Sequence, residues 1–174
     1  MANTTSVHQL QTVTTQDIAE LSTLLIDCVE GGASVGFMWP MTSAKAATYW
    51  QDVAAKVQRG ERLLLVARDH TTIVGTVSLV LEQPENQPHR ADLVKMLVHR
   101  RARRQGLGAA LLTAAEQHAR MAGKTLLVLD TASAEAERLY RRQGWQRSGA
   151  IPHYALWPDG TLCTTVIYFK LLES

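Results

Sequence analysis

Apolar residues recur every three or four positions in four segments of the chain, a spacing that indicates helices with one buried face. These segments are residues 18–28, 43–60, 107–121 and 134–142. Glycine follows each segment closely, as is common where helices end. Hydroxyl residues precede the first two and can cap them, Thr14 or Thr15 for one and Ser43 for the other. The pattern therefore predicts four helices.

Short apolar runs between turn residues predict strands around these helices. The runs LLLVA and IVGTVSLVL are separated only by a short polar stretch, so they are expected to form a hairpin. The continuous run LLVLD has the character of a strand that is buried on both faces. The predicted strands cover residues 7–13, 63–67, 73–81, 91–98, 126–130 and 165–172.

Strands that come first as a meander and then alternate with helices indicate an α+β (mixed α/β) fold. We expect residues 1–174 to form a single domain, built on a central twisted mixed sheet of about seven strands with helices on both faces. A chain of this length with 46% apolar residues is suited to one packed core and is unlike a disordered chain.

Composition narrows the class of protein further. No segment approaches the ~20 consecutive apolar residues that span a bilayer. The first residues have neither the basic nor the apolar part of a secretion signal, so a cytoplasmic protein without membrane partners is expected. Cys28 and Cys163 have no metal-ligand spacing, which predicts two buried thiols and neither a disulfide nor a metal site.

The segment GGASVGFMWPM, residues 31–41, has no clean period and is predicted to be a loop. Its side chains Phe37, Met38 and Trp39 either pack into the core or face a ligand. We take Phe37 and Met38 as candidate substrate-binding residues.

A basic, glycine-bearing turn joins the predicted strand 91–98 to the helix 107–121. The first turn of a helix has unpaired N–H groups and a partial positive charge, so this turn is a candidate phosphate site. It lacks the Lys-Ser/Thr of a Walker loop and the third glycine of a dinucleotide fingerprint. The candidate phosphate-binding residues are Arg103, Arg104, Gln105, Gly106, Leu107, Gly108 and Ala109.

The same basic cluster has a second interpretation, which is contact with nucleic-acid phosphates. A nucleic-acid module usually adds exposed aromatic residues or a wider basic face, and Tyr140 in a separate motif is the only aromatic residue nearby. Coenzyme phosphates are therefore favoured over nucleic acid.

The spacing from Arg103 to Gly108 resembles the pyrophosphate-binding pattern of the GNAT superfamily of N-acetyltransferases. Downstream, AERLYRRQGWQ resembles the family's alanine, tyrosine and glycine-aromatic series at the end of its last helix. The resemblance covers roughly residues 62–171 and implies acetyl-CoA as cosubstrate. The family often has asparagine where this chain has Ser133, which implies a different cofactor contact at that position.

The resemblance also implies roles for particular residues. The backbone of Met96, Leu97 and Val98 would pair with the pantetheine arm, and one of its N–H groups would stabilise the oxyanion. Tyr140 would donate a proton to the coenzyme thiolate, because a phenol stays protonated at neutral pH. The alternative for Tyr140 is a packing role in the core.

A reacting amine must lose a proton, and carboxylates near the predicted cleft are the candidate bases. Asp92 begins the strand 91–98, and Asp130 ends the apolar run LLVLD. Each could act as the base, directly or through water, or hold a substrate ammonium, and Asp130 could instead cap the next helix. Glu82, at another strand end, is a third choice.

The segments GGASVGFM, LDT, and PDG followed by IYFK are most similar to the tabtoxin-resistance acetyltransferases. This closer resemblance implies a small amine acceptor, such as a β-lactam amino-acid toxin. Acetylation of a protein N-terminus or lysine, and a non-catalytic acyl-CoA sensor, remain alternatives. A homodimer through the C-terminal strand TVIYFKLL is also expected by analogy with the superfamily.

Overall fold

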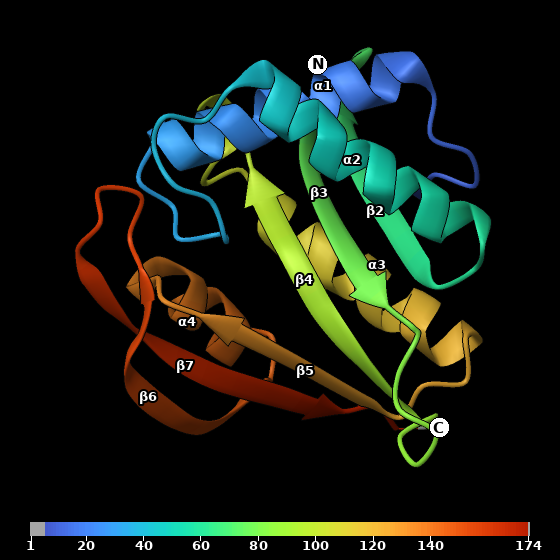
Figure 1. The fold of residues 1–174 in the computed structure, drawn as a ribbon. Coiled ribbons are helices and arrows are strands. Elements are labelled where there is room, and N and C mark those ends of the chain that lie inside the picture. The colour runs from blue at the N-terminus through green and yellow to red at the C-terminus, as the bar shows by residue number, and fades with distance from the viewer. Residues whose placement is uncertain (1–5, 174) are drawn as a thin grey trace.

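The computed structural model describes residues 6–173, which form one seven-stranded mixed sheet with helices on both faces (Figure 1). The strand order is β1-β2-β3-β4-β5-β7-β6. The elements in chain order are β1 (Ser6–Gln9), α1 (Thr15–Glu30), α2 (Ser43–Gln58), β2 (Arg62–Asp69), β3 (Thr72–Val80), β4 (Arg90–Val98), the 3₁₀ turn η1 (Arg100–Ala102), α3 (Leu107–Met121), β5 (Leu126–Thr131), α4 (Ala134–Arg142), β6 (Gln146–Leu156) and β7 (Leu162–Leu171). The mixed fold predicted from the sequence is confirmed.

Neighbouring strands run antiparallel everywhere except at one position. β1 to β4 form an antiparallel meander, β5 pairs antiparallel with β7, and β7 with β6. β4 and β5 are parallel, and α3 makes the crossover between them. Two antiparallel halves therefore meet at a single parallel junction in the middle of the sheet.

Two apolar clusters fill the layers on either side of the sheet. One lies between the sheet and α1 and α2, and includes Trp50 from α2 and Leu64 from β2. The other contains the buried face of α3 and also Tyr140 from α4. Since alternate residues of a strand point to opposite faces, β2 sends Leu64 to the first cluster and Leu65 to the second.

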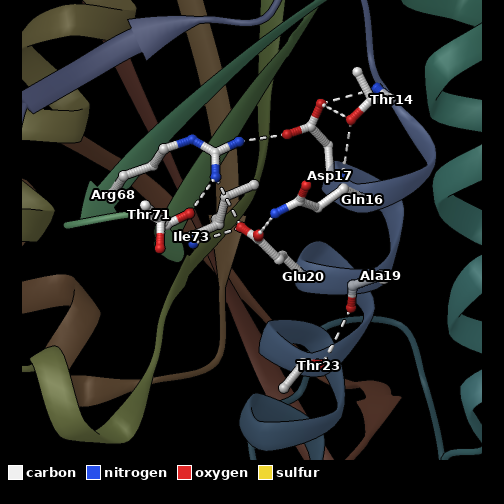
Figure 2. Close-up of polar contacts among 9 residues, drawn as sticks. All are labelled: Thr14, Gln16, Asp17, Ala19, Glu20, Thr23, Arg68, Thr71 and Ile73. Carbon is white, nitrogen blue, oxygen red and sulfur yellow. Dashed lines mark hydrogen bonds and ion pairs between the residues drawn. The ribbon is translucent and has the colours of Figure 1, made fainter.

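The start of α1 is tied to the β2–β3 turn (Figure 2). Thr14 and Asp17 form a capping box, with Thr14 N–H donating to Asp17 Oδ2 at 2.8 Å and Asp17 N–H to Thr14 Oγ1 at 3.1 Å. Arg68 donates to both Asp17 and Glu20, and Glu20 also accepts from the Ile73 N–H at 2.9 Å. These contacts fix where α1 begins over the sheet.

Several element boundaries differ from the sequence-based expectations. β1 ends at Gln9, not at residue 13, and the cap of α2 is Thr42, one residue before the predicted Ser43. β6 was not predicted, because its sequence QRSGAIPHYAL lies almost wholly exposed at the sheet edge and so lacks apolar alternation.

The place of the C-terminal strand also corrects an expectation. TVIYFKLL lies in β7, between β5 and β6, so it is an interior strand and not the free edge on which the predicted dimer rested. The edge on this side of the sheet is β6, which contains Pro152 and has two register shifts against β7. Such irregularities are typical of edge strands.

Both cysteines are free and buried, as predicted. Burial raises the pKa of the Cys28 thiol to about 11, so that thiol stays protonated. Within residues 6–173, none of the helices has the length and apolar character needed to cross a membrane.

Candidate active site

The centre of the sheet opens into a cleft because β4 and β5 pair over only a short length. Their register runs from Arg90 opposite Leu126 to Asp92 opposite Val128, and beyond these pairs the strands diverge (Figure 1). A cavity of about 270 Å³ lies in the gap. Its lining residues are Asp92, Leu93, Val94, Val128, Leu129, Asp130 and Ile167. Of the three carboxylates singled out from the sequence, Asp92 and Asp130 therefore line this cavity, and Glu82 does not.

A β-bulge interrupts β4 beside the cleft. Thr76 pairs with Leu97 and Ser78 with Val94, so two residues of β4, Lys95 and Met96, lie opposite Val77. Lys95 has a left-handed backbone, with φ of 52°. The bulge overlaps, at Met96, the start of the stretch Met96–Val98 for which the sequence predicted pairing with the pantetheine arm.

The predicted phosphate turn lies at the N-terminus of α3. Gly106 is the N-cap, has φ of 78° and provides no side chain to the first-turn N–H groups. Arg104 also has a positive φ, of 61°. A helix start without a capping side chain presents unpaired N–H groups, which is the arrangement that binds phosphate.

The four arginines of the basic cluster fall into two pairs. Arg100 donates to Asp27 at 2.8 Å, and Arg101 donates to Asp69 at 2.9 Å. In the described part of the chain, Arg103 and Arg104 have no ion pair with a carboxylate, and Arg103 Nε donates to the Val98 carbonyl at 3.2 Å. Two of the four guanidinium groups are thus left for an anion.

The start of α3 packs directly against α4. A Cβ built at Gly108 would lie 2.8 Å from Leu139 Cδ2, closer than side-chain contacts allow. Gly108 therefore permits α4 to approach the predicted phosphate turn. Tyr140 directly follows Leu139 in α4.

Tyr140 is buried in the core beside the cleft, with 4% of its surface exposed. Its ring lies 5.9 Å from the rings of Trp145 and Tyr168. Burial, and after it the negative charge of Asp130, raises the pKa of the Tyr140 phenol. Across residues 6–173 its hydroxyl has no hydrogen-bond partner. The phenol is thus protonated at neutral pH and has a proton to donate.

The two candidate carboxylates have different surroundings. Asp92 accepts hydrogen bonds from Arg90 and, at 3.1 Å, from Gln83. Asp130 is exposed, and the Thr165 hydroxyl donates to it at 3.0 Å. In the described residues, Asp130 therefore has fewer hydrogen-bond donors around its carboxylate than Asp92 has. Glu82, the third choice, is exposed just beyond β3.

Ser133, at the position where the superfamily often has asparagine, caps α4. Its hydroxyl accepts from the Ala136 N–H at 3.2 Å. One lone pair of that oxygen is thereby used in a structural role.

The loop before α2 lies against the β6–β7 turn. The backbone N–H of Trp39 donates to the Pro158 carbonyl at 3.2 Å, and the Ser34 hydroxyl donates to the Leu156 carbonyl at 3.1 Å. Phe37 packs edge-on against Tyr49 of α2 at 5.3 Å, and Met38 is half-buried. Of the two alternatives for Phe37, packing is observed, and its ring also contacts two lysine ammonium groups.

Two basic residues near the cleft were missed from the sequence. Lys95 Nζ lies 5.6 Å from the centre of the Phe37 ring and 5.5 Å from that of Tyr49. Arg62, at the start of β2, donates to the Tyr49 hydroxyl at 3.3 Å. The available signal was one lysine inside the apolar strand ADLVKMLV, which disagrees with the expectation that such a strand is apolar.

Comparison with known proteins gives a family match and a relative. The model of the acetyltransferase (GNAT) family matches residues 19–145. An Azospirillum brasilense protein described as an uncharacterized N-acetyltransferase is 29% identical over 171 residues, covering 88% of this chain and 96% of that protein.

Solved structures share the fold at lower identity. Ribosomal-protein-alanine N-acetyltransferase from Brucella melitensis has a TM-score of 0.79 at 23% identity, covering 96% of this chain and 99% of that one. The Salmonella typhimurium protein yncA, solved with its cofactor acetyl-CoA, has a TM-score of 0.80 at 17% identity, covering 99% and 96%. A phosphinothricin acetyltransferase from Sinorhizobium meliloti, in complex with acetyl-CoA, has a TM-score of 0.79 at 16% identity, covering 97% and 89%.

Proposed function

Because the chain belongs to the GNAT family of acetyltransferases, whose members use acetyl-CoA, we propose that it acetylates the primary amine of a small amino-acid-like acceptor. The observation that carries this proposal is the cavity between β4 and β5, which has Asp130 in its wall and Tyr140 within electrostatic reach of that carboxylate. Acetyl transfer to an amine needs a proton acceptor and a proton donor close together, and this pair supplies both.

Acetyl-CoA would bind along the line from the phosphate turn to the cleft. The pyrophosphate would contact the N–H groups of residues 106–109 and the unpaired guanidinium groups of Arg103 and Arg104. The pantetheine arm would follow the backbone of Met96, Leu97 and Val98, where β4 has left β5. The thioester would then lie at the cavity.

The reaction would proceed by direct attack of the amine on the thioester carbonyl. Asp130, directly or through a water molecule, would accept the proton of the acceptor ammonium, and a β4 N–H near the bulge would stabilise the oxyanion. The new N–C bond forms as the C–S bond breaks, and Tyr140 would donate its proton to the leaving thiolate. The second amine proton leaves the nitrogen as the amide forms and would restore the Tyr140 phenol through water.

The size of the cavity supports a small acceptor. Its volume is about 270 Å³, and the loop before α2 is joined to the β6–β7 turn by the contacts of Ser34 and Trp39. Within this class we propose an amino-acid toxin of the tabtoxin type, on the resemblance of GGASVGFM, LDT and PDG-IYFK.

A second acceptor class, protein N-termini or lysines, is favoured by one structural neighbour, which is named as a ribosomal-protein-alanine N-acetyltransferase. The test is thiol release from acetyl-CoA by purified protein with free amino acids and their analogues, and mass spectrometry of peptides treated the same way. Transfer to free amino acids with unmodified peptides supports the small acceptor. Modified peptides with inert amino acids would overturn it.

Asp130→Asn and Asp92→Asn form a matched pair for the identity of the base. Asp130→Asn is expected to lower kcat about a hundredfold or more at neutral pH, because it removes the proton acceptor. Asp92→Asn is expected to act mainly on stability, since Asp92 is bound to Arg90 and Gln83. A larger loss of kcat in Asp92→Asn than in Asp130→Asn would assign the base to Asp92.

We also propose that a homodimer, if formed, uses the exposed edge strand β6. Ile151, Tyr154 and Leu156 are large exposed residues of that strand. Light scattering after size exclusion measures the oligomeric state, and Tyr154→Lys should shift a dimer to monomer. A dimer that is unaffected by Tyr154→Lys would place the contact elsewhere.

A further inference from the structure

Two cations on the α1–α2 side of the sheet have carboxylate charges near them only at longer range, Asp130 for Lys95 and Asp52 for Arg62. Lys95 and Arg62 are half-buried, and within residues 6–173 neither forms an ion pair. Arg62 Nε is fully buried and has no hydrogen-bond partner. Buried polar atoms are nearly always paired, so this guanidinium group is incompletely hydrogen-bonded, and an added acceptor for its other nitrogens would be favourable.

Tyr49 brings the two cations into one cluster. Its hydroxyl accepts from Arg62 Nη1 at 3.3 Å, and Lys95 Nζ lies 5.5 Å from its ring centre. The two charges are within electrostatic reach, because the pKa of Lys95 is lowered first by burial and then by the charge of Arg62. Like charges gathered in this way are unfavourable unless an anion binds between them.

The position of Lys95 relates this cluster to the reaction. Lys95 is the bulge residue of β4, directly after Val94, which lines the cavity. The charge of Asp130, on the opposite wall of the cavity, also acts on Lys95. Asp130 therefore lies in the cavity wall, and Lys95 follows the residue that lines the other wall, with Arg62 within electrostatic reach of it. This charge arrangement suits a zwitterion with its ammonium toward Asp130.

We propose that Lys95 and Arg62 form the subsite that binds the carboxylate of the acceptor, so that the enzyme selects free amino-acid-like amines over amines whose carboxyl group is amidated. The inference rests on the proposed function and deepens it, because it names the feature by which the acceptor is recognised. A peptide N-terminus lacks this carboxylate and would leave the two cations unpaired.

The test compares common L-amino acids with their C-terminal carboxamides as acceptors. Wild type should prefer the acid over its carboxamide by about ten- to a hundredfold in kcat/KM, the loss expected for charged hydrogen bonds. Lys95→Met should bring that ratio close to one, Lys95→Arg should retain most of it, and Arg62→Gln should reduce it. The carboxamides of aspartate and glutamate show whether a side-chain carboxylate can serve instead.

Lys45→Met is the matched control. Lys45 Nζ also lies over the Phe37 ring, at 5.8 Å, but the residue is exposed in the first turn of α2. Its replacement should leave the acid-to-carboxamide ratio unchanged. Acetyl-CoA affinity and circular dichroism confirm that each variant is folded.

Equal use of acids and carboxamides by wild type would overturn the proposal, as would a ratio that Lys95→Met leaves intact. If neither set of amines is acetylated, the proposed function fails, and the subsite is judged by binding alone. In that case N-acetyl-L-amino acids should raise the melting temperature of wild type but not of Lys95→Met. No stabilisation of wild type would overturn the subsite as well.

Discussion

Gly108 of α3 and Leu139 of α4 are in such close contact that a Cβ on Gly108 would lie 2.8 Å from Leu139 Cδ2. The phosphate turn and the helix that carries Tyr140 are therefore positioned by the same contact. A change at the turn is expected to act on Tyr140, the proposed proton donor, as well as on cofactor affinity.

Gly108→Ala tests this coupling. The added methyl group should displace Leu139 and destabilise the protein by about 1 kcal/mol, toward the lower end of overpacking effects because the end of a leucine side chain can move. Both the Kd for acetyl-CoA and kcat should worsen, as measured by calorimetric titration and thiol release. Gly149→Ala is the matched control, because a Cβ at Gly149 meets nothing within 4 Å. Equal stability of Gly108→Ala and Gly149→Ala would contradict the expectation that a Cβ at Gly108 clashes with Leu139.

Tyr140→Phe is expected to lower kcat by about a hundred- to ten-thousandfold, the range for loss of a general acid. Affinity for acetyl-CoA and stability should change little, because the hydroxyl has no hydrogen-bond partner in residues 6–173. The pKa of Tyr140 is raised above its ordinary value of 10, so the phenol stays protonated up to that pH. Ionisation of Tyr140 should therefore cause no fall in the wild-type rate as pH rises toward 10. Steady-state kinetics across pH measures both.

Tyr168→Phe provides the opposite case for comparison with Tyr140→Phe. The Tyr168 hydroxyl donates to Glu137 at 2.7 Å and accepts from Arg141 at 2.9 Å. Its removal should cost about 1 kcal/mol of stability and leave kcat nearly unchanged. If Tyr140→Phe retained full kcat, the phenol would have only a packing role.

The two pairs of arginines should behave differently when replaced by methionine. Arg103→Met and Arg104→Met should each weaken acetyl-CoA binding about tenfold and reduce its dependence on salt, because they remove charges available to phosphate. Arg100→Met and Arg101→Met remove ion pairs with Asp27 and Asp69 and should change affinity little. Titrations at two salt concentrations separate the pairs, and equal effects from all four would show a diffuse basic surface.

Lys95→Met should make the protein more stable at neutral pH, since a half-buried, unpaired cation is removed. Burial, and after it the charge of Arg62, place the pKa of Lys95 in the folded protein below its ordinary value of 10.5. Between those two values the unfolded chain holds a proton that the folded chain has lost, so rising pH stabilises wild type relative to the variant. The stability difference should narrow as pH approaches 10.5, as denaturant titrations would show. A variant less stable than wild type at pH 7 would mean that the ring contacts of Lys95 outweigh its desolvation.

Local features of the sequence predicted much of the fold. The positions of the helices followed from apolar spacing and from caps such as Thr14, and the glycine turn before α3 from glycines beside a basic run. β6 was not predicted because an exposed edge strand has no apolar alternation, and because its Pro152 argues against a strand.

The site was less predictable because it depends on contacts between distant residues. Nothing local shows that Arg100 and Arg101 meet Asp27 and Asp69, which decides how many arginines are free. The bulge at Lys95 reverses the side-chain alternation of β4, so that Leu97 packs toward α1 and α2 while Val98 packs toward α3. A strict period of two would have assigned these side chains to the wrong faces.

The short junction between β4 and β5 has a consequence for the lifetime of the protein. The two halves of the sheet are joined across its middle by the register pairs from Arg90–Leu126 to Asp92–Val128. A cofactor lying along the open part of β4 would complete the hydrogen bonding there and hold the halves together, while the empty protein would open locally at lower cost. Proteases act on such opened states, so the supply of acetyl-CoA would govern how long each molecule survives, with slower limited proteolysis of the saturated protein as the observable sign.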